Sequence, residues 1–260
     1  MNLNLKGKIV LVTGGAKGIG AAIVRATAAE GAIPVYLDRD VEAGEKLRSA
    51  LQSAGSENLF ISGEITAPQT CSKAIDQTLK QFGRLDALVN NVGANDNVSL
   101  QHGTVDKFVA SLELNLVHYY TMAHYALPAL MTARGSIVNI SSKTAVTGQG
   151  GTSGYVAAKA AILGLTREWA AELLPKGIRV NAVIPAEVDT PLYKQWVSGF
   201  PNPEEKLAKI VSKIPLGKRM TKPEEIADMV LFLLSERASH ITGQHIFVDA
   251  GYTHLDRALT

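Results

Sequence analysis

The feature that most constrains the fold is a regular alternation of short apolar runs with longer amphipathic stretches. The amphipathic stretches predict helices from the glycine-rich turn to residue 30 and at about 40–54, 68–82, 105–130, 154–174 and 223–234. The apolar runs predict strands at 8–12, 33–37, 58–62, 87–90, 136–141, 178–183 and 244–248. Strands this continuously apolar are buried on both faces, as in parallel sheets. The order predicts right-handed βαβ crossovers and an α/β fold, a doubly wound, Rossmann-like parallel sheet with helices on both faces.

The chain shows no composition shift that would mark a linker between domains. We therefore expect its 260 residues to form a single dinucleotide-binding catalytic domain over 1–260. Residues 190–220 break the alternation, because four prolines interrupt a mixed polar and aromatic stretch. An insertion of this length is typically a functional lid or a disordered excursion, and we predict a lid-like insertion.

Charge and composition exclude several classes of protein. The 26 basic and 24 acidic residues give a net charge of +2 with no basic tail, so neither nucleic acid nor an anionic membrane is an expected partner. The apolar runs are too short to span a bilayer. The single cysteine, Cys71, cannot form an internal disulfide and fits a reducing, cytoplasmic compartment. The histidines show no metal-ligand spacing, so we expect a mechanism without a metal.

A glycine-rich turn joins the first predicted strand to the first helix. Glycines allow a tight turn and a close approach of a pyrophosphate, and the helix that follows offers unpaired N–H groups and the positive end of its dipole. The turn therefore predicts a dinucleotide phosphate site formed by Gly14, Lys17, Gly18, Ile19 and Gly20.

The end of the second strand bears on which dinucleotide binds. Asp38 stands where a carboxylate can accept both ribose hydroxyls and repel a 2′-phosphate, which favours NAD over NADP. The next residue, Arg39, could instead bind a phosphate or stack on adenine, so NADP stays open.

Several motifs, in order along nearly the whole chain, resemble the short-chain dehydrogenase/reductase family. They are residues 13–20, 90–93, Asn115, the pair Ser141-Ser142, Tyr155-x-x-x-Lys159 and residues 181–191, with Ser142 placed 13 residues before Tyr155. The resemblance implies catalytic roles for Asn115, Ser142, Tyr155 and Lys159. It also implies that Asn115 kinks its helix and anchors a water relay from Lys159.

The residue types at these positions suit proton transfer coupled to hydride transfer. Tyr155 and Lys159 share one helix face because they are four residues apart. A free phenol has a pKa near 10, and a nearby ammonium together with a positive nicotinamide ring is expected to lower the pKa of Tyr155. Tyr155 could then act as a general base on a substrate hydroxyl, while Ser142 holds the reacting oxygen.

The resemblance implies further contacts with the dinucleotide. Its nicotinamide end is expected to meet Tyr155 and Lys159 as well as Pro185, Val188 and Thr190. Its adenine end is expected near Glu64 and Ile65, and its middle beside Asn91 and Gly93.

The segments that meet substrate in this family are rich in polar and aromatic residues here. The expected substrate residues are Asn95, Ser142, Gln149, Tyr155, Glu187 and Trp196. Many hydrogen-bonding groups suit a polyhydroxylated substrate. We therefore expect an NAD(P)-dependent oxidoreductase that oxidises a secondary or hemiacetal hydroxyl of a sugar or polyol.

Two other functions stay open at this point. One is an NADPH-dependent carbonyl reductase of the 3-oxoacyl type, which Asp38 disfavours and Arg39 allows. The other is a non-catalytic dinucleotide-sensing protein, which would have no need of the Ser142, Tyr155 and Lys159 set. By resemblance, the helices at 105–130 and 154–174 are expected to pair copies of the chain into a homotetramer or homodimer.

Overall fold

The centre of the molecule is a sheet of seven parallel strands, in a computed structural model that describes residues 2–255. Their order across the sheet is β3-β2-β1-β4-β5-β6-β7. The strands are β1 (Ile9–Thr13), β2 (Ile33–Asp38), β3 (Leu59–Ser62), β4 (Ala87–Asn90), β5 (Ser136–Ile140), β6 (Arg179–Pro185) and β7 (His245–Val248). The predicted doubly wound parallel sheet is confirmed.

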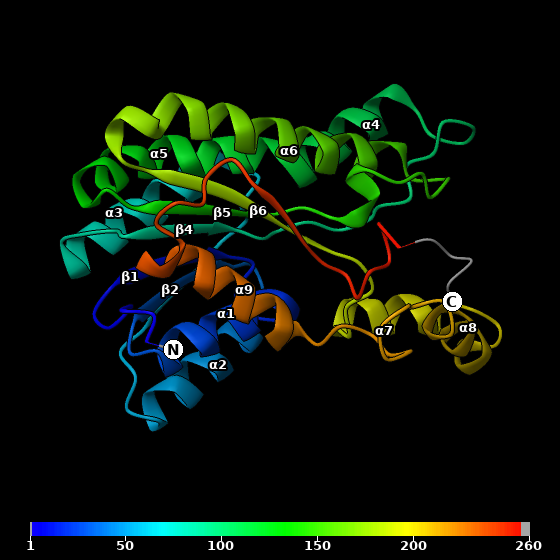
Figure 1. Cartoon of the computed structure of the whole chain (residues 1–260), viewed down its shortest axis with the longest axis horizontal. Coiled ribbons are helices and arrows are strands. Elements are labelled where there is room, and N and C mark those ends of the chain that lie inside the picture. The colour runs from blue at the N-terminus through cyan, green and yellow to red at the C-terminus, as the bar shows by residue number, and fades with distance from the viewer. Residues whose placement is uncertain (1, 256–260) are drawn as a thin grey trace.

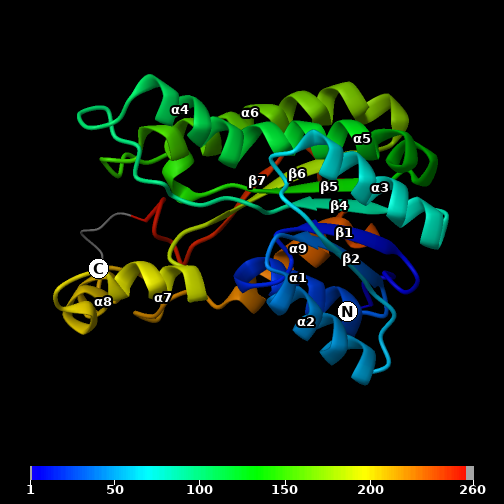
Figure 2. The same cartoon turned by 180° about the vertical axis from the view of Figure 1, so that it is seen from behind.

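Helices cover both faces of this sheet, as the crossovers require. One face carries α1 (Gly18–Ala29), α2 (Val41–Ser53) and α9 (Pro223–Leu234). The other carries α3 (Pro68–Phe82), α5 (His118–Ala133) and α6 (Ser153–Leu173), with α4 (Val105–Leu112) at one end of that layer. Figure 1 and Figure 2 show the three layers from opposite sides.

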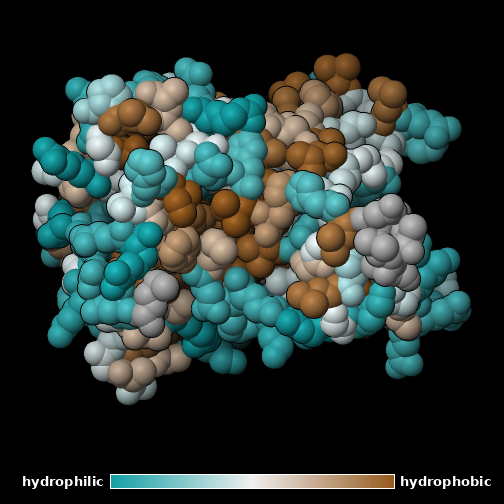
Figure 3. All heavy atoms as spheres, viewed as in Figure 1, coloured by the Kyte–Doolittle hydropathy of each residue, from teal (hydrophilic) through white to brown (hydrophobic). Residues whose placement is uncertain are grey.

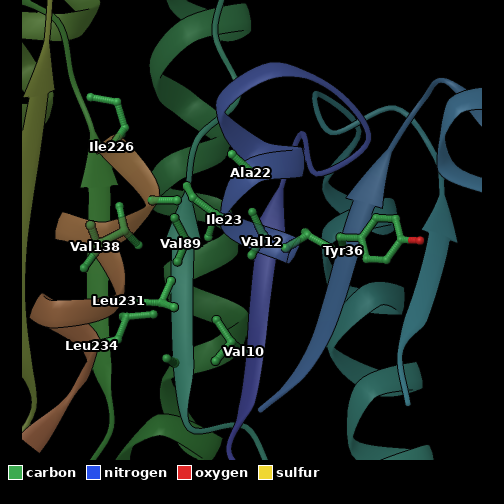
Figure 4. Close-up of a cluster of buried hydrophobic side chains, with 14 of the residues drawn as sticks. Val10, Val12, Ala22, Ile23, Tyr36, Val89, Val138, Ile226, Leu231 and Leu234 are labelled. Carbon is green, nitrogen blue, oxygen red and sulfur yellow. The ribbon is translucent and has the colours of Figure 1, made fainter. Parts of the chain in front are cut away.

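Each strand supplies apolar side chains to both faces, because successive residues point in opposite directions. In β1, Val10 and Val12 pack toward α1 and α9, whereas Ile9 and Leu11 pack toward α3 and α5. Figure 4 shows the first of these two clusters, with Ile23 and Leu231 from the covering helices. Complete burial of such a side chain contributes about 1.5–3 kcal/mol, so these two clusters hold the helices against both faces of the sheet.

The predicted helix at 105–130 is not continuous. A π-helical turn, Glu113–Val117, separates α4 from α5, and Asn115 lies within it. The kink that the family resemblance implied at Asn115 therefore takes the form of one wider turn. π-turns of this kind occur frequently at functional sites.

The region expected as an irregular lid contains two helices, α7 (Pro191–Ser198) and α8 (Pro203–Val211). Two of the prolines that suggested an interruption occupy the first turn of these helices, where a missing N–H costs little. Thr190 caps α7, since its hydroxyl accepts a hydrogen bond from the Tyr193 N–H at 3.2 Å. Both helices stand to one side of the two helical layers (Figure 1, Figure 2).

Two properties of residues 2–255 concern membranes and metals. None of the helices there has both the length and the apolar character needed to cross a membrane. The described residues also contain no group of three His, Cys, Asp or Glu side chains placed to hold a metal ion.

Candidate active site

A cavity of about 530 Å³ opens at the carboxyl ends of the strands, where the strand order reverses between β1 and β4. Ligands of open α/β sheets bind in this crevice. Its lining includes every predicted dinucleotide residue except Gly20: Gly14, Lys17, Gly18, Ile19, Asp38, Arg39, Glu64, Ile65, Asn91, Gly93, Tyr155, Lys159, Pro185, Val188 and Thr190.

A second cavity of about 720 Å³ lies at the amino ends of the strands, next to Lys8, Ser136 and Arg179. It contains none of the predicted site residues. The Arg179 guanidinium there donates to carbonyls at the end of α9, including that of Leu233 at 2.7 Å. This cation therefore caps a helix, and the predicted site residues gather in the first cavity.

The turn before α1 has the geometry of a phosphate site. Gly14 and Gly18 adopt φ angles of +64° and +54°, which side-chain-bearing residues rarely adopt. A Cβ at Gly20 would lie 1.9 Å from the Gly14 carbonyl oxygen, so Gly20 shapes the turn from behind rather than lining the cavity. Gly18 and Ile19 bring the N-terminus of α1 to the cavity, where its free N–H groups and dipole favour an anion. The turn therefore fits a dinucleotide pyrophosphate.

At the adenosine end, the carboxylate of Asp38 is fixed by backbone donors. Its oxygens accept hydrogen bonds from the N–H groups of Ala16 and Asp40, each at 3.0 Å. Arg39 forms an ion pair with Glu64 at 3.3 Å. Lys17 pairs with Asp40, and that pairing raises the pKa of Lys17 and lowers the pKa of Asp40. Both cations near the ribose position thus already have carboxylate partners.

The middle of the cavity is held by residues that follow β4. The Asn91 side chain donates to the carbonyl oxygens of Thr13 at 3.0 Å and Gly14 at 3.2 Å, which ties β4 to the phosphate turn. A Cβ at Gly93 would lie 2.8 Å from Lys159 Nζ. Gly93 therefore leaves the space that the lysine occupies.

Three of the four predicted catalytic residues line the same cavity. Ser142 follows β5, and its Oγ accepts hydrogen bonds from the Thr144 N–H at 3.3 Å and the Thr144 hydroxyl at 3.0 Å. The Ser142 hydroxyl proton is then free to be donated to Tyr155, which lies on α6. Lys159 lies one turn further along the same helix.

Lys159 is only 2% exposed. Its Nζ donates to the Tyr119 hydroxyl and to the Ile140 carbonyl oxygen, both at 3.0 Å. Both partners are neutral, so burial lowers the pKa of Lys159 to about 7. Sequence reasoning missed Tyr119, although its position four residues after Asn115 on the same predicted helix was a usable signal.

The predicted lowering of the Tyr155 pKa is wrong for the chain's own groups. Burial raises the pKa of Tyr155, and the hydrogen bond with Ser142 lowers it by less. Lys159 Nζ lies 5.7 Å from the Tyr155 ring centroid and is hydrogen-bonded elsewhere. Lowering this pKa therefore needs a further positive charge in the cavity.

Asn115 is fully buried and does not line the cavity. Its Oδ1 accepts from the Ala94 N–H at 2.8 Å, and its Nδ2 donates to the Ser111 carbonyl oxygen at 3.0 Å. His118 acts similarly at the same π-turn, since its Nε2 lies 2.9 Å from the Leu114 carbonyl oxygen. Burial lowers the pKa of His118 to about 3, so the ring is neutral and Nε2 donates. These two side chains hold the wider turn open.

The structure separates the predicted substrate residues. Ser142 and Tyr155 line the cavity, whereas Asn95, Gln149 and Trp196 are exposed and lie outside its lining. Glu187 is largely buried and directly follows Ala186, which lines the cavity. It forms an ion pair with Lys143, a residue that sequence reasoning missed because no local pattern singled it out.

This geometry defines a dinucleotide-dependent oxidoreductase, and comparisons with known proteins agree. A family model described as enoyl-(acyl carrier protein) reductase matches residues 14–253. The chain is 38% identical over 246 residues to L-fucose dehydrogenase of Mus musculus, covering 94% of this chain and 88% of that protein. It is 35% identical over 251 residues to the 3-oxoacyl-(acyl-carrier-protein) reductase FabG of Thermotoga maritima, covering 96% and 99%. The crystal structure of Cj0485 dehydrogenase superposes with a TM-score of 0.94 at 46% identity, covering 100% of this chain and 99% of that one.

The chain therefore belongs to the short-chain dehydrogenase/reductase family. It is an NAD(P)-dependent oxidoreductase that acts on CH–OH groups.

Proposed function

We propose that this enzyme oxidises a secondary or hemiacetal hydroxyl of a sugar such as L-fucose, or of a polyol, with NAD as hydride acceptor. The observation that carries the proposal is that Ser142, Tyr155 and Lys159 line the same cavity as the phosphate turn. The substrate class is supported by similarity to the L-fucose dehydrogenase. The charged pair Lys143 and Glu187 next to that cavity also favours a polar substrate over an acyl chain.

In the proposed mechanism, the Ser142 hydroxyl holds the substrate oxygen and Tyr155 removes its proton. The bound dinucleotide supplies hydride acceptance and, when oxidised, the positive charge that favours the Tyr155 phenolate. Lys159 holds a donor 5.7 Å from the centroid of the Tyr155 ring, and its hydrogen bonds to the Tyr119 hydroxyl and the Ile140 carbonyl oxygen fix the position of its Nζ. General acid–base catalysis of this kind contributes about 10²–10⁴-fold to the rate.

The preference for NAD rests on the fixed carboxylate of Asp38. Held by two backbone N–H groups, it lines the cavity at the end of β2 and would repel a 2′-phosphate bound beside it. Arg39 and Lys17 are each paired with a carboxylate and so offer such a phosphate little net positive charge.

The second candidate is a 3-oxoacyl reductase that uses NADPH, and the FabG relative favours it. The two functions differ in cofactor, substrate and preferred direction. A third, a non-catalytic dinucleotide sensor, is disfavoured because the chain has a complete Ser142, Tyr155 and Lys159 set.

A screen that crosses both dinucleotides with aldoses, polyols and hydroxyacyl thioesters tests these alternatives through the absorbance of reduced nicotinamide. We expect the highest kcat/KM with NAD and a sugar or polyol. Faster reduction of 3-oxoacyl thioesters by NADPH would refute the proposal in favour of the second candidate. Tight dinucleotide binding without turnover of any substrate would favour the sensor.

We also propose that residues 1–260 work as one catalytic domain and that copies of it associate through the layer of α4, α5 and α6. Hydrophobic side chains gather on the surface where α4 lies (Figure 3). Val105, Val109, Val117 and Tyr120 are among the exposed apolar residues of this layer. Sedimentation is expected to give a homotetramer or homodimer, and a monomer at micromolar concentration would contradict this.

A further inference from the structure

Beside the cavity, just outside its lining, lies an ion pair that the proposed mechanism does not use. Lys143 Nζ contacts the Glu187 carboxylate, and the two side chains are only 11% and 14% exposed. Lys143 directly follows Ser142, and Glu187 directly follows Ala186, and both of these neighbours line the cavity. The pair therefore sits where the loops after β5 and β6 meet.

Two tyrosines from other segments complete the cluster. Lys143 Nζ lies 3.9 Å from the ring centroid of Tyr252, which is in the turn after β7. The Tyr193 hydroxyl, from α7, donates a hydrogen bond to Glu187. Tyr193 also lines the cavity and packs on Trp196, with ring centroids 5.2 Å apart. Three stretches that are distant in sequence, around residues 143, 187–193 and 252, thus converge on one pair of charges.

Stability alone is a weak reason to keep such a pair. Taking two charges out of water costs several kcal/mol for each ion, and well-packed apolar residues of similar volume are often as stable. A paired ammonium and carboxylate instead offer a donor and an acceptor side by side. Two hydroxyl groups on neighbouring carbons can use both, because each hydroxyl donates one hydrogen bond and also accepts.

We propose that Lys143 and Glu187 form a specificity-determining pair that recognises the hydroxyl groups beside the carbon being oxidised. Tyr193 and Tyr252 hold the pair in place. This inference rests on the proposed oxidation of a sugar or polyol and extends it to named residues. A neutral polyol leaves the charges balanced, whereas an anionic substrate would face the Glu187 carboxylate.

The test compares the wild type with Glu187→Gln and Lys143→Met on two substrates. One is the best sugar found for the wild type, and the other is cyclohexanol, which has no neighbouring hydroxyl. We expect each variant to raise the KM for the sugar by ~10–100-fold, since a hydrogen bond to a charged group contributes about 1.5–3 kcal/mol. The kcat for the sugar, the kcat/KM for cyclohexanol and the Kd for NAD are expected to stay within about threefold of the wild type.

Lys194→Met is the matched control. Lys194, on α7, forms an ion pair of 3.0 Å with Asp189, and the two side chains are 70% and 46% exposed. Removing this exposed pair should leave the KM for both substrates unchanged. If a single variant fails to fold because one charge is left unpaired, the double variant Lys143→Met/Glu187→Leu removes both charges and keeps the comparison.

Each outcome decides a separate point. Equal losses on the sugar and on cyclohexanol would mean that the pair only supports the loops, and unchanged kinetics would mean that it has no role, so either result overturns the inference alone. No turnover of any sugar or polyol by the wild type would overturn the proposed function and the inference together.

Discussion

Replacing the buried lysine of the active site should make the protein more stable in a way that depends on pH. Lys159 is 2% exposed, and burial lowers its pKa from 10.5 to about 7. At pH 6 the folded protein must therefore bury an ammonium that only neutral groups contact. Lys159→Met removes that charge and keeps a side chain of similar length.

The sign follows from proton binding in the two states. Between pH 7 and 10.5 the unfolded chain holds the Lys159 proton and the folded chain does not, so stability of the wild type rises with pH. One pKa unit corresponds to about 1.36 kcal/mol, so the buried ammonium costs about 5 kcal/mol at pH 6. Losing the hydrogen bonds to Tyr119 and Ile140 offsets about 1–3 kcal/mol of this. We therefore expect the free energy of unfolding of Lys159→Met to exceed that of the wild type by about 2–4 kcal/mol at pH 6. This difference should shrink by about 2–3 kcal/mol at pH 9, because the wild type becomes more stable as pH rises.

Urea unfolding at pH 6 and pH 9 measures both quantities. The control is Lys73→Met, which removes an exposed lysine on α3 and should shift the free energy of unfolding little at either pH. The reasoning is refuted if Lys159→Met changes stability by the same amount at both pH values. It is also refuted if the variant is less stable than the wild type at pH 6.

Three further substitutions test the site and its frame. Tyr155→Phe should lower kcat by ~10²–10⁴-fold because the proton acceptor is lost, with the Kd for NAD unchanged in a fluorescence titration; near-normal kcat would exclude Tyr155 as the base. Asp38→Ser should raise the kcat/KM ratio of NADP to NAD by ~10–100-fold, because a like-charge contact with the 2′-phosphate is removed; an unchanged ratio in steady-state assays would place the discrimination elsewhere. Gly20→Ala should lower the free energy of unfolding by about 1–3 kcal/mol, because its Cβ would lie 1.9 Å from the Gly14 carbonyl oxygen. Gly148→Ala is the control, since a Cβ there meets no atom within 4 Å, and equal urea midpoints for the two variants would contradict the close approach at Gly20.

The parts of the site that the sequence predicted are those with a local cause. A phosphate turn needs glycine at fixed positions of one βα junction, and Tyr155 and Lys159 share a face because four residues separate them on one helix. Strand positions follow from apolar runs whose two faces are both buried. Each of these signals lies within a few residues of the element that it predicts.

What the sequence did not predict depends on distant segments or on the balance of environments. Lys143 and Glu187 are 44 residues apart and meet only because β5 and β6 are neighbours in the sheet. The predicted lowering of the Tyr155 pKa rests on the ammonium of Lys159 and on a bound nicotinamide ring. Among the chain's own groups burial, which the spacing does not reveal, has the largest effect and raises this pKa. The prolines at residues 191 and 203 predict interruptions from sequence, because a proline at the start of a helix and one in a loop look alike there.

The wider turn at Asn115 sets a limit on attempts to make this enzyme more robust. Side chains bond to the backbone within it and just before it, because Asn115 donates to the Ser111 carbonyl oxygen and His118 to that of Leu114. Rebuilding 105–133 from strong helix formers, a standard route to thermostability, would straighten the segment and withdraw the amide that holds the loop at Ala94. Engineering for heat resistance should therefore keep the π-helical turn and increase stability at other positions.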